Sequence, residues 1–292
     1  MLRFKLSDGT QIDSVGFGTY KITDDLTGSK SVNIVKSALD AGYRYIDTAT
    51  LYENEREVGE AVRASGLKRE EVFIATKIPK NCLGYEKTKA ATENSLSLLD
   101  NEYIDLMLIH WPVEFAGDTQ WKEKLQGSYR ALEEAVREGK IRALGLSNFL
   151  PHHIMALMET VQIKPVLNQL ELHVGFMQQY ACDYCRKNDI QLQAWSPLGR
   201  LRVFEHPLVK ELAEKYSVNV SDILLRFLLQ QGIAVIPKAT SEAHILSNLN
   251  PAEFVISEED MSRLLTLPET GWGGEHPDFE REKTDLRYMA DC

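Results

Sequence analysis

Four polar side chains in the first part of the chain have the residue types that acid–base chemistry on an oxygen atom needs. Asp47, Lys77 and His110 each follow a short apolar run, and Tyr52 comes five residues after Asp47. A buried lysine needs a counter-charge, which Asp47 can supply. An ammonium close to a phenol favours the phenolate and lowers the pKa of the phenol, so we expect Tyr52 to be a proton donor near neutral pH.

His110 completes the set, because its imidazole can hydrogen-bond a substrate oxygen and fix the orientation of that oxygen. The four residues therefore predict protonation of an oxygen that gains negative charge during the reaction. They include no metal-ligand cage and no serine or cysteine nucleophile with its base, so no metal is expected. The same residues also permit a purely structural interpretation, in which Asp47 and Lys77 form an interstrand ion pair and Tyr52 is a loop aromatic.

Short apolar runs and amphipathic helical segments alternate along the chain and must position these residues. The runs are 15–18, 43–46, 72–75, 104–109, 141–146, 165–168, 190–194 and 233–236. Helical periodicity covers 29–40, 55–65, 86–99, 121–137, 151–160, 177–188, 207–216, 221–231, 241–248 and 257–267. Eight strand–helix units predict an α/β protein with a (β/α)8 TIM barrel, formed by a single domain over residues 1–292. An alternating segment with an Asp8-Gly9 turn predicts a β-hairpin before the first barrel strand.

A doubly wound dinucleotide-binding sheet is the alternative fold, and its glycine fingerprint fails here. Gly16-Phe17-Gly18 is followed by Lys21 at the position of the third glycine. In a barrel, functional residues come from the carboxyl ends of different strands. All eight apolar runs are followed by polar or aromatic residues, which we expect to share one rim: Thr19-Tyr20, Asp47, Lys77, His110-Trp111, Ser147-Asn148, Gln169, Trp195-Ser196 and Lys238.

Composition limits the partners of the protein. With 43 acidic and 33 basic residues the net charge is −10, which argues against nucleic-acid binding. The longest apolar runs are too short to cross a bilayer, and the first residues contain no apolar secretory segment, so no membrane partner is expected. Four cysteines form no disulfide framework, which favours the cytoplasm. No coiled coil is evident, and we expect a monomer.

Two clusters of residues of metal-binding type are weak evidence for a metal or redox site. Cys182 and Cys185 have the spacing of a redox motif but fall inside a helical segment, with no second pair beside them. His152 and His153 are adjacent in a first helical turn, and adjacent helical residues are not expected to share a face.

Several motifs in one order resemble the aldo-keto reductase family. They are GYRYIDTATLYENE at 42–55, LSLLDNEYIDLMLIHWP at 96–112, GLSN at 145–148, NQ at 168–169, WSPLG at 195–199 and VIPK at 235–238. The resemblance covers nearly the whole chain and implies a (β/α)8 barrel that reduces aldehydes and ketones with NADPH, reversibly. It implies that Tyr52 is the general acid, that Lys77 and Asp47 tune it, and that His110 orients the carbonyl.

The resemblance also assigns the cofactor site. It implies that Ser147, Asn148 and Gln169 hold the nicotinamide carboxamide and that Trp195 stacks on the ring. The remaining cofactor contacts that it implies are Thr19, Tyr20, Asp47, Ser196, Leu198, Lys238, Thr240, His244 and Asn248. Lys238 precedes a helix that starts near Thr240, and the free amides of a helix start favour an anion such as the 2′-phosphate of NADPH.

Two residues depart from the family pattern at the phosphate site. His244 stands where relatives commonly have Arg, and Ala239 stands where they have Ser. Neutral histidine cannot make the two-pronged contact of arginine with phosphate, so NADH is a possible second cofactor.

The expected substrate is a small carbonyl compound, bound by Tyr20, His110 and Trp111. We expect the tail from Gly271, which contains Trp272, to help shape this pocket. Two alternatives stay open. The same residues can work mainly as an alcohol or sugar dehydrogenase, or the barrel can sense the cofactor without catalysis.

Overall fold

Eight parallel strands form the centre of this computed structural model, which describes residues 2–22 and 28–279. Their spatial order follows their order in the chain, and a bridge between Val15 and Val235 joins the first strand to the last. The sheet therefore closes into the predicted barrel. Its strands are β3 (Phe17–Gly18), β4 (Tyr45–Asp47), β5 (Phe73–Ile78), β6 (Ile104–Ile109), β7 (Ile141–Ser147), β8 (Leu167–Glu171), β9 (Gln191–Trp195) and β10 (Ala234–Val235).

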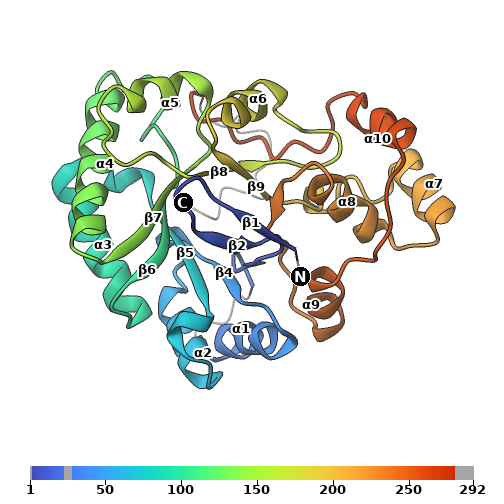
Figure 1. The fold of residues 1–292 in the computed structure, drawn as a ribbon, viewed down its shortest axis with the longest axis horizontal. Helices are drawn as coiled ribbons and strands as arrows, with labels where there is room; N and C mark the ends of the chain where they lie inside the picture. The colour runs from blue at the N-terminus through green and yellow to red at the C-terminus, as the bar shows by residue number, and fades with distance from the viewer. Residues whose placement is uncertain (1, 23–27, 280–292) are drawn as a thin grey trace.

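Helices surround the strands, as Figure 1 shows. The helices are α1 (Ser29–Ala41), α2 (Glu55–Ala64), α3 (Tyr85–Leu99), α4 (Trp121–Arg137), α5 (Pro151–Met158), α6 (Gln179–Lys187), α7 (Pro207–Tyr216), α8 (Val220–Leu229), α9 (Glu242–Leu249) and α10 (Glu258–Leu265). Most bury their apolar face against the outer face of the barrel, whereas α7 packs on α8 and α10 packs on α7.

Two strands extend more than one residue beyond their apolar runs. β5 continues through Lys77 to Ile78, and β8 continues through Gln169 to Glu171. Lys77 lies opposite Leu108 of β6, and Gln169 lies opposite Gln193 of β9. Pairing with the neighbouring strand, rather than hydrophobicity, sets these ends. Both polar residues are therefore held inside strands rather than in loops.

The predicted hairpin closes the amino end of the barrel. β1 (Arg3–Lys5) and β2 (Gln11–Asp13) pair antiparallel and lie across the strands in Figure 1. Leu6 and Ile12 are buried in the same cluster as Tyr45, Leu106 and Leu167 from the barrel interior. With this end filled, the carboxyl ends of the strands form the accessible rim.

Candidate active site

A buried ion pair lies at the carboxyl rim. Asp47 is the last residue of β4, and the Nζ atom of Lys77 lies 2.5 Å from its Oδ1 atom. Nζ also donates to the carbonyl of Thr48 at 2.8 Å, and both charged side chains are at most 1 % exposed. Burial raises the pKa of the Asp47 carboxyl and lowers the pKa of the Lys77 ammonium, and each partner opposes the shift of the other.

Tyr52 ends a short 3₁₀ helix, η1 (Thr50–Tyr52), directly above this pair. The Lys77 ammonium lies 4.8 Å from the centre of its ring. The Tyr52 ring also contacts the rings of Tyr20 and His110, with centroids 4.9 and 5.8 Å away. The four residues that the sequence singled out thus lie together, from η1, β4, β5 and the residue after β6.

The side chain of Asn54 holds the Tyr52 loop in place. Its Nδ2 donates to the carbonyl of Thr19 at 2.9 Å, and its Oδ1 accepts from the Thr48 hydroxyl at 2.7 Å. Glu53, between Tyr52 and Asn54, adopts the left-handed conformation with φ 54°. The loop is therefore tied to β3 and β4 directly beside the ion pair.

The expectation that the ammonium lowers the pKa of Tyr52 is wrong for this structure. The pKa of the phenol is raised well above 10, chiefly because packing removes it from water and also because of the negative charge of Asp47. The hydrogen bonds of Lys77 go to Asp47 and Thr48, and the negative charge of Asp47 opposes the effect of the ammonium on the resting phenol. Tyr52 is accordingly a protonated phenol over the whole neutral range.

His110 is a neutral imidazole in this environment. Burial, and then the charge of Lys77, hold its pKa well below 6.5. Its ring lies against that of Trp111, with centroids 6.4 Å apart. A neutral ring carries one N–H, which is enough to donate one hydrogen bond to a substrate oxygen.

The residues expected to hold the nicotinamide form a hydrogen-bonded group next to the ion pair, joined where the backbone amide of Asn148 donates to the backbone carbonyl of Gln169 at 2.9 Å. Gln169 Nε2 donates to Asp47 Oδ2 at 2.7 Å. Trp195 Nε1 donates to Asn148 Oδ1 at 2.9 Å, and Asn148 Nδ2 donates to the carbonyl of His110 at 3.0 Å. Asn148 and Ser196 both have positive φ angles, at 62° and 48°. Hydrogen bonds within the protein therefore hold the side chains on this side of the rim in place without a bound ligand.

The expected phosphate residues lie around the start of α9. Ser241 caps the helix by accepting from the amide of His244 at 3.4 Å. Lys238, Thr240 and His244 are exposed there, whereas Asn248 is buried. Exposed positive charge beside free helix amides suits an anion.

Thr19 is fully buried, and its hydroxyl donates to the carbonyl of Asp47 at 3.0 Å. Its hydroxyl is thus engaged within the protein. Leu198 is half-buried in the loop after β9 and packs against the outer core.

The segment from Thr270 to Phe279 packs onto loops at the same rim. The amide of Thr270 donates to the carbonyl of Gly175, and Trp272 stacks on Phe176 with ring centroids 6.0 Å apart. Glu275 pairs with Arg200 at 3.4 Å, and both charges act on the Tyr52 phenol. Sequence reasoning missed Arg200 and Glu275, although Arg200 directly follows the WSPLG motif.

The two adjacent histidines point the same way, contrary to expectation. The rings of His152 and His153 have centroids 3.8 Å apart, and both approach the carboxylate of Asp278. The Nδ1 atom of His153 accepts from the amide of Leu150 at 3.2 Å, so its Nε2 carries the proton and donates to Asp278 at 2.8 Å. A metal ligand at Nε2 must give up that proton, so the arrangement suits a hydrogen-bonded pair rather than a metal site.

The cysteine pair is part of the core. Cys182 and Cys185 are both fully buried in α6, and burial raises the pKa of their thiols to about 12 and about 11. Such thiols are unreactive.

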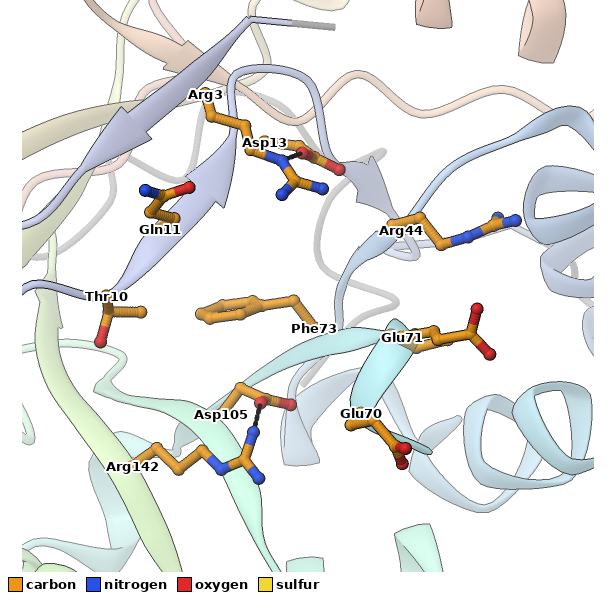
Figure 2. Close-up of a pocket in the computed structure, with 11 residues that line it drawn as sticks. Arg3, Thr10, Gln11, Asp13, Arg44, Glu70, Glu71, Phe73, Asp105 and Arg142 are labelled. Atoms are coloured by element: carbon orange, nitrogen blue, oxygen red, sulfur yellow. Dashed lines mark hydrogen bonds and ion pairs between the residues drawn. The ribbon is translucent and has the colours of Figure 1, made fainter. Parts of the chain in front are cut away.

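A cavity of about 310 Å³ lies at the opposite end of the barrel, beside the hairpin (Figure 2). Its charged residues largely pair with one another: Arg3 with Asp13 at 2.9 Å, and Arg142 with Asp105 at 3.1 Å. It is lined by residues at the amino ends of β4 to β7 and so lies away from Tyr52.

In residues 2–22 and 28–279, no helix combines the length and the apolar character needed to cross a membrane.

Comparisons with known proteins agree with this geometry. The sequence profile of the Aldo/keto reductase family matches residues 14–267. The chain is 42 % identical over 277 residues to the uncharacterized oxidoreductase YtbE of Bacillus subtilis, and 40 % identical over 274 residues to the glyoxal reductase of the same organism. Each alignment covers 94 % of this chain and 95 % of the relative.

A solved structure extends the likeness to a protein that holds a cofactor. The structure of a Bombyx mori aldo-keto reductase in complex with NADP superposes with a TM-score of 0.81 at 31 % identity. The match covers 90 % of this chain and 91 % of that one. The chain belongs to the aldo/keto reductase family of NADPH-dependent oxidoreductases.

Proposed function

We propose that the rim around Tyr52 is the active site and that it reduces aldehydes and ketones to alcohols. The observation that carries the proposal is the convergence of the Tyr52 phenol with the Asp47–Lys77 pair and His110 at the accessible end of the barrel. When bound, NADPH supplies a hydride from C4 of its nicotinamide ring to the carbonyl carbon.

The chain's own residues act on the carbonyl oxygen. His110 donates a hydrogen bond to it and fixes its direction. As negative charge develops, Tyr52 transfers its hydroxyl proton to the oxygen, and the new phenolate lies beside the Lys77 ammonium, which stabilises it. Solvent then returns a proton to Tyr52. Running the same steps backwards gives alcohol oxidation.

The residues present fit the cofactor. The Nε2 of Gln169 faces Asp47, so its amide oxygen is left for a donor such as the carboxamide N–H. The indole ring of Trp195 offers a flat surface for stacking, and its orientation is fixed by the hydrogen bond from Nε1 to Asn148. The exposed Lys238 before α9 offers positive charge for a phosphate group. Ser147, Asn148, Gln169 and Trp195 are the proposed nicotinamide contacts, with Ser196, Leu198, Lys238, Thr240, His244 and Asn248 along the rest of the dinucleotide.

The proposed substrates are small aldehydes, including dicarbonyls such as glyoxal. One of the B. subtilis relatives is named as a reductase of this compound. Tyr20 and Trp111 continue the ring contacts of Tyr52 and His110, which supports an aromatic pocket over the reacting carbonyl. The test is the initial rate of NADPH and NADH oxidation with glyoxal, methylglyoxal, aromatic aldehydes and simple ketones. Tight NADPH binding without turnover of any carbonyl would replace this proposal with the cofactor-sensing role.

Replacing His244 with Arg is expected to raise the preference for NADPH over NADH by about tenfold, the value of one charge-assisted hydrogen bond. His244 is exposed in the first turn of α9, so a guanidinium there can reach the 2′-phosphate. The ratio of kcat/KM for the two cofactors measures the effect. The control is His244→Gln, which adds no charge and should leave the ratio unchanged. Equal gains for both cofactors would show that this position does not contact the 2′-phosphate.

We further propose that residues 1–292 act as one domain and as a monomer in the cytoplasm. The free thiols of Cys82, Cys182 and Cys185 support a reducing compartment.

A further inference from the structure

A chain of hydrogen bonds continues from Asp47 into the barrel interior. Gln169 Nε2 donates to Asp47 Oδ2 at 2.7 Å and to Gln193 Oε1 at 2.8 Å. The Tyr45 hydroxyl lies 3.1 Å from Gln193 Oε1 and 3.0 Å from its Nε2. All four side chains are at most 1 % exposed. None of the catalytic steps uses Gln193 or Tyr45.

The chemistry of these groups fixes which way the Gln169 amide points. An ionised carboxylate only accepts hydrogen bonds, so Gln169 must present its NH2 group to Asp47. The second proton of that NH2 goes to Gln193 Oε1. Because the two N–H protons of Gln169 point to two different acceptors, the plane of its side-chain amide is fixed. The amide oxygen then faces away from both acceptors.

The Gln169 oxygen has no protein partner among residues 2–22 and 28–279, although its NH2 has two. It therefore has the capacity to accept a hydrogen bond from a ligand. Tyr45 supports this arrangement from the other side, because its hydroxyl contacts both ends of the Gln193 amide. Burial keeps the pKa of Tyr45 well above 10, so the hydroxyl stays neutral.

We propose that Gln193, held by Tyr45, is a positioning residue for the nicotinamide: it fixes the Gln169 amide so that its oxygen accepts from the carboxamide N–H. The site then selects ring substituents that carry an N–H donor over substituents of similar shape that lack one. This inference rests on the proposed assignment of Gln169 to the carboxamide.

The experiment compares the binding of NADP⁺ with that of its 3-acetylpyridine analogue, in which a methyl group replaces the amide NH2. Quenching of protein fluorescence gives both dissociation constants without turnover. The wild type is expected to prefer NADP⁺ by about tenfold, the effect of one hydrogen bond to a preorganised acceptor. Gln193→Met keeps the side-chain length but removes the acceptor, and should reduce the preference to about twofold or less.

Tyr45→Phe removes only the support of Gln193 and should give an intermediate preference. The matched control is Tyr129→Phe, which removes another buried hydroxyl, one that donates to the carbonyl of Ile163. It should bind both ligands as the wild type does. A general loss of stability would weaken both ligands together, whereas the inference requires a loss of selectivity.

Retention of the tenfold preference in Gln193→Met overturns the inference. If that variant does not fold, an unchanged preference in Tyr45→Phe overturns it instead. A wild type that binds NADP⁺ but does not discriminate shows that Gln169 does not contact the carboxamide, and this also overturns the inference while leaving the reductase proposal intact. A wild type that binds neither ligand refutes the proposed function itself.

Discussion

Replacement of Tyr52 by Phe is expected to lower kcat for carbonyl reduction by about two to four orders of magnitude, the usual contribution of a general acid. The change removes one hydroxyl and keeps the ring that packs against Tyr20 and His110. NADPH affinity should therefore stay within about twofold of the wild type. Single-turnover oxidation of NADPH with glyoxal, beside a fluorescence titration of NADPH, measures both quantities.

The pH dependence of the wild type gives an independent check on the same assignment. The raised pKa of Tyr52 keeps the acid protonated as the pH increases, and the lowered pKa of His110 keeps that ring neutral as the pH falls. Neither group changes charge between about pH 6.5 and 10, the unperturbed pKa values of the two side chains. We therefore expect neither Tyr52 nor His110 to titrate in the profile of kcat/KM across this interval, and any fall of the rate toward alkaline pH belongs to Lys77, whose pKa burial lowers. Tyr129→Phe, which removes a buried hydroxyl outside the site, is the control variant and should keep the activity of the wild type. Full activity in Tyr52→Phe would show that another group supplies the proton.

Replacement of Lys77 by Met is expected to abolish reduction and to lower the free energy of unfolding by about 3–5 kcal/mol. The change leaves the carboxylate of Asp47 buried, with Gln169 as its remaining side-chain hydrogen-bond partner. Urea unfolding monitored by circular dichroism measures the loss. Part of the stability should return as the pH falls, because a buried carboxyl with a raised pKa binds its proton more tightly in the folded state.

The double variant Asp47→Leu/Lys77→Met separates charge from packing. It removes both charges of this pair, so Asp47 is no longer left as a buried unpaired ion, and its stability should exceed that of Lys77→Met. It should be as inactive as the single variant. A double variant no more stable than Lys77→Met would attribute the loss to packing rather than to the unpaired carboxylate.

Local periodicity was enough to predict the barrel and its hairpin, because each strand and helix shows its buried face in its own sequence. The convergence of Asp47, Lys77 and His110 followed from the rule that parallel strands bring their carboxyl ends to one rim. The ends of β5 and β8 could not be predicted in this way. They depend on pairing with β6, β7 and β9, which is not visible in a single segment.

The pKa of Tyr52 was mispredicted because two opposing effects act on the phenol. The proximity of Lys77 was foreseeable from the motif, but the extent of burial and the competing bond to Asp47 belong to the folded state. The position of Gln193 near the site is visible in the sequence. It lies two residues before Trp195, on the same face of β9, just as Tyr45 precedes Asp47 on β4.

The hairpin covers the amino end of a barrel whose interior is filled with side chains, so the proposed site opens to solvent at the carboxyl rim. Leu6 and Ile12 fill one end, so the hydride donor and the carbonyl compound must arrive and depart through the same opening. Gln169 lies deep in that opening, whereas Tyr20 is 38 % exposed near its surface. The molecule that occupies the deeper position has to enter first and leave last. With the nicotinamide at Gln169, as proposed, we therefore expect ordered exchange, in which the dinucleotide binds first and the alcohol departs before it.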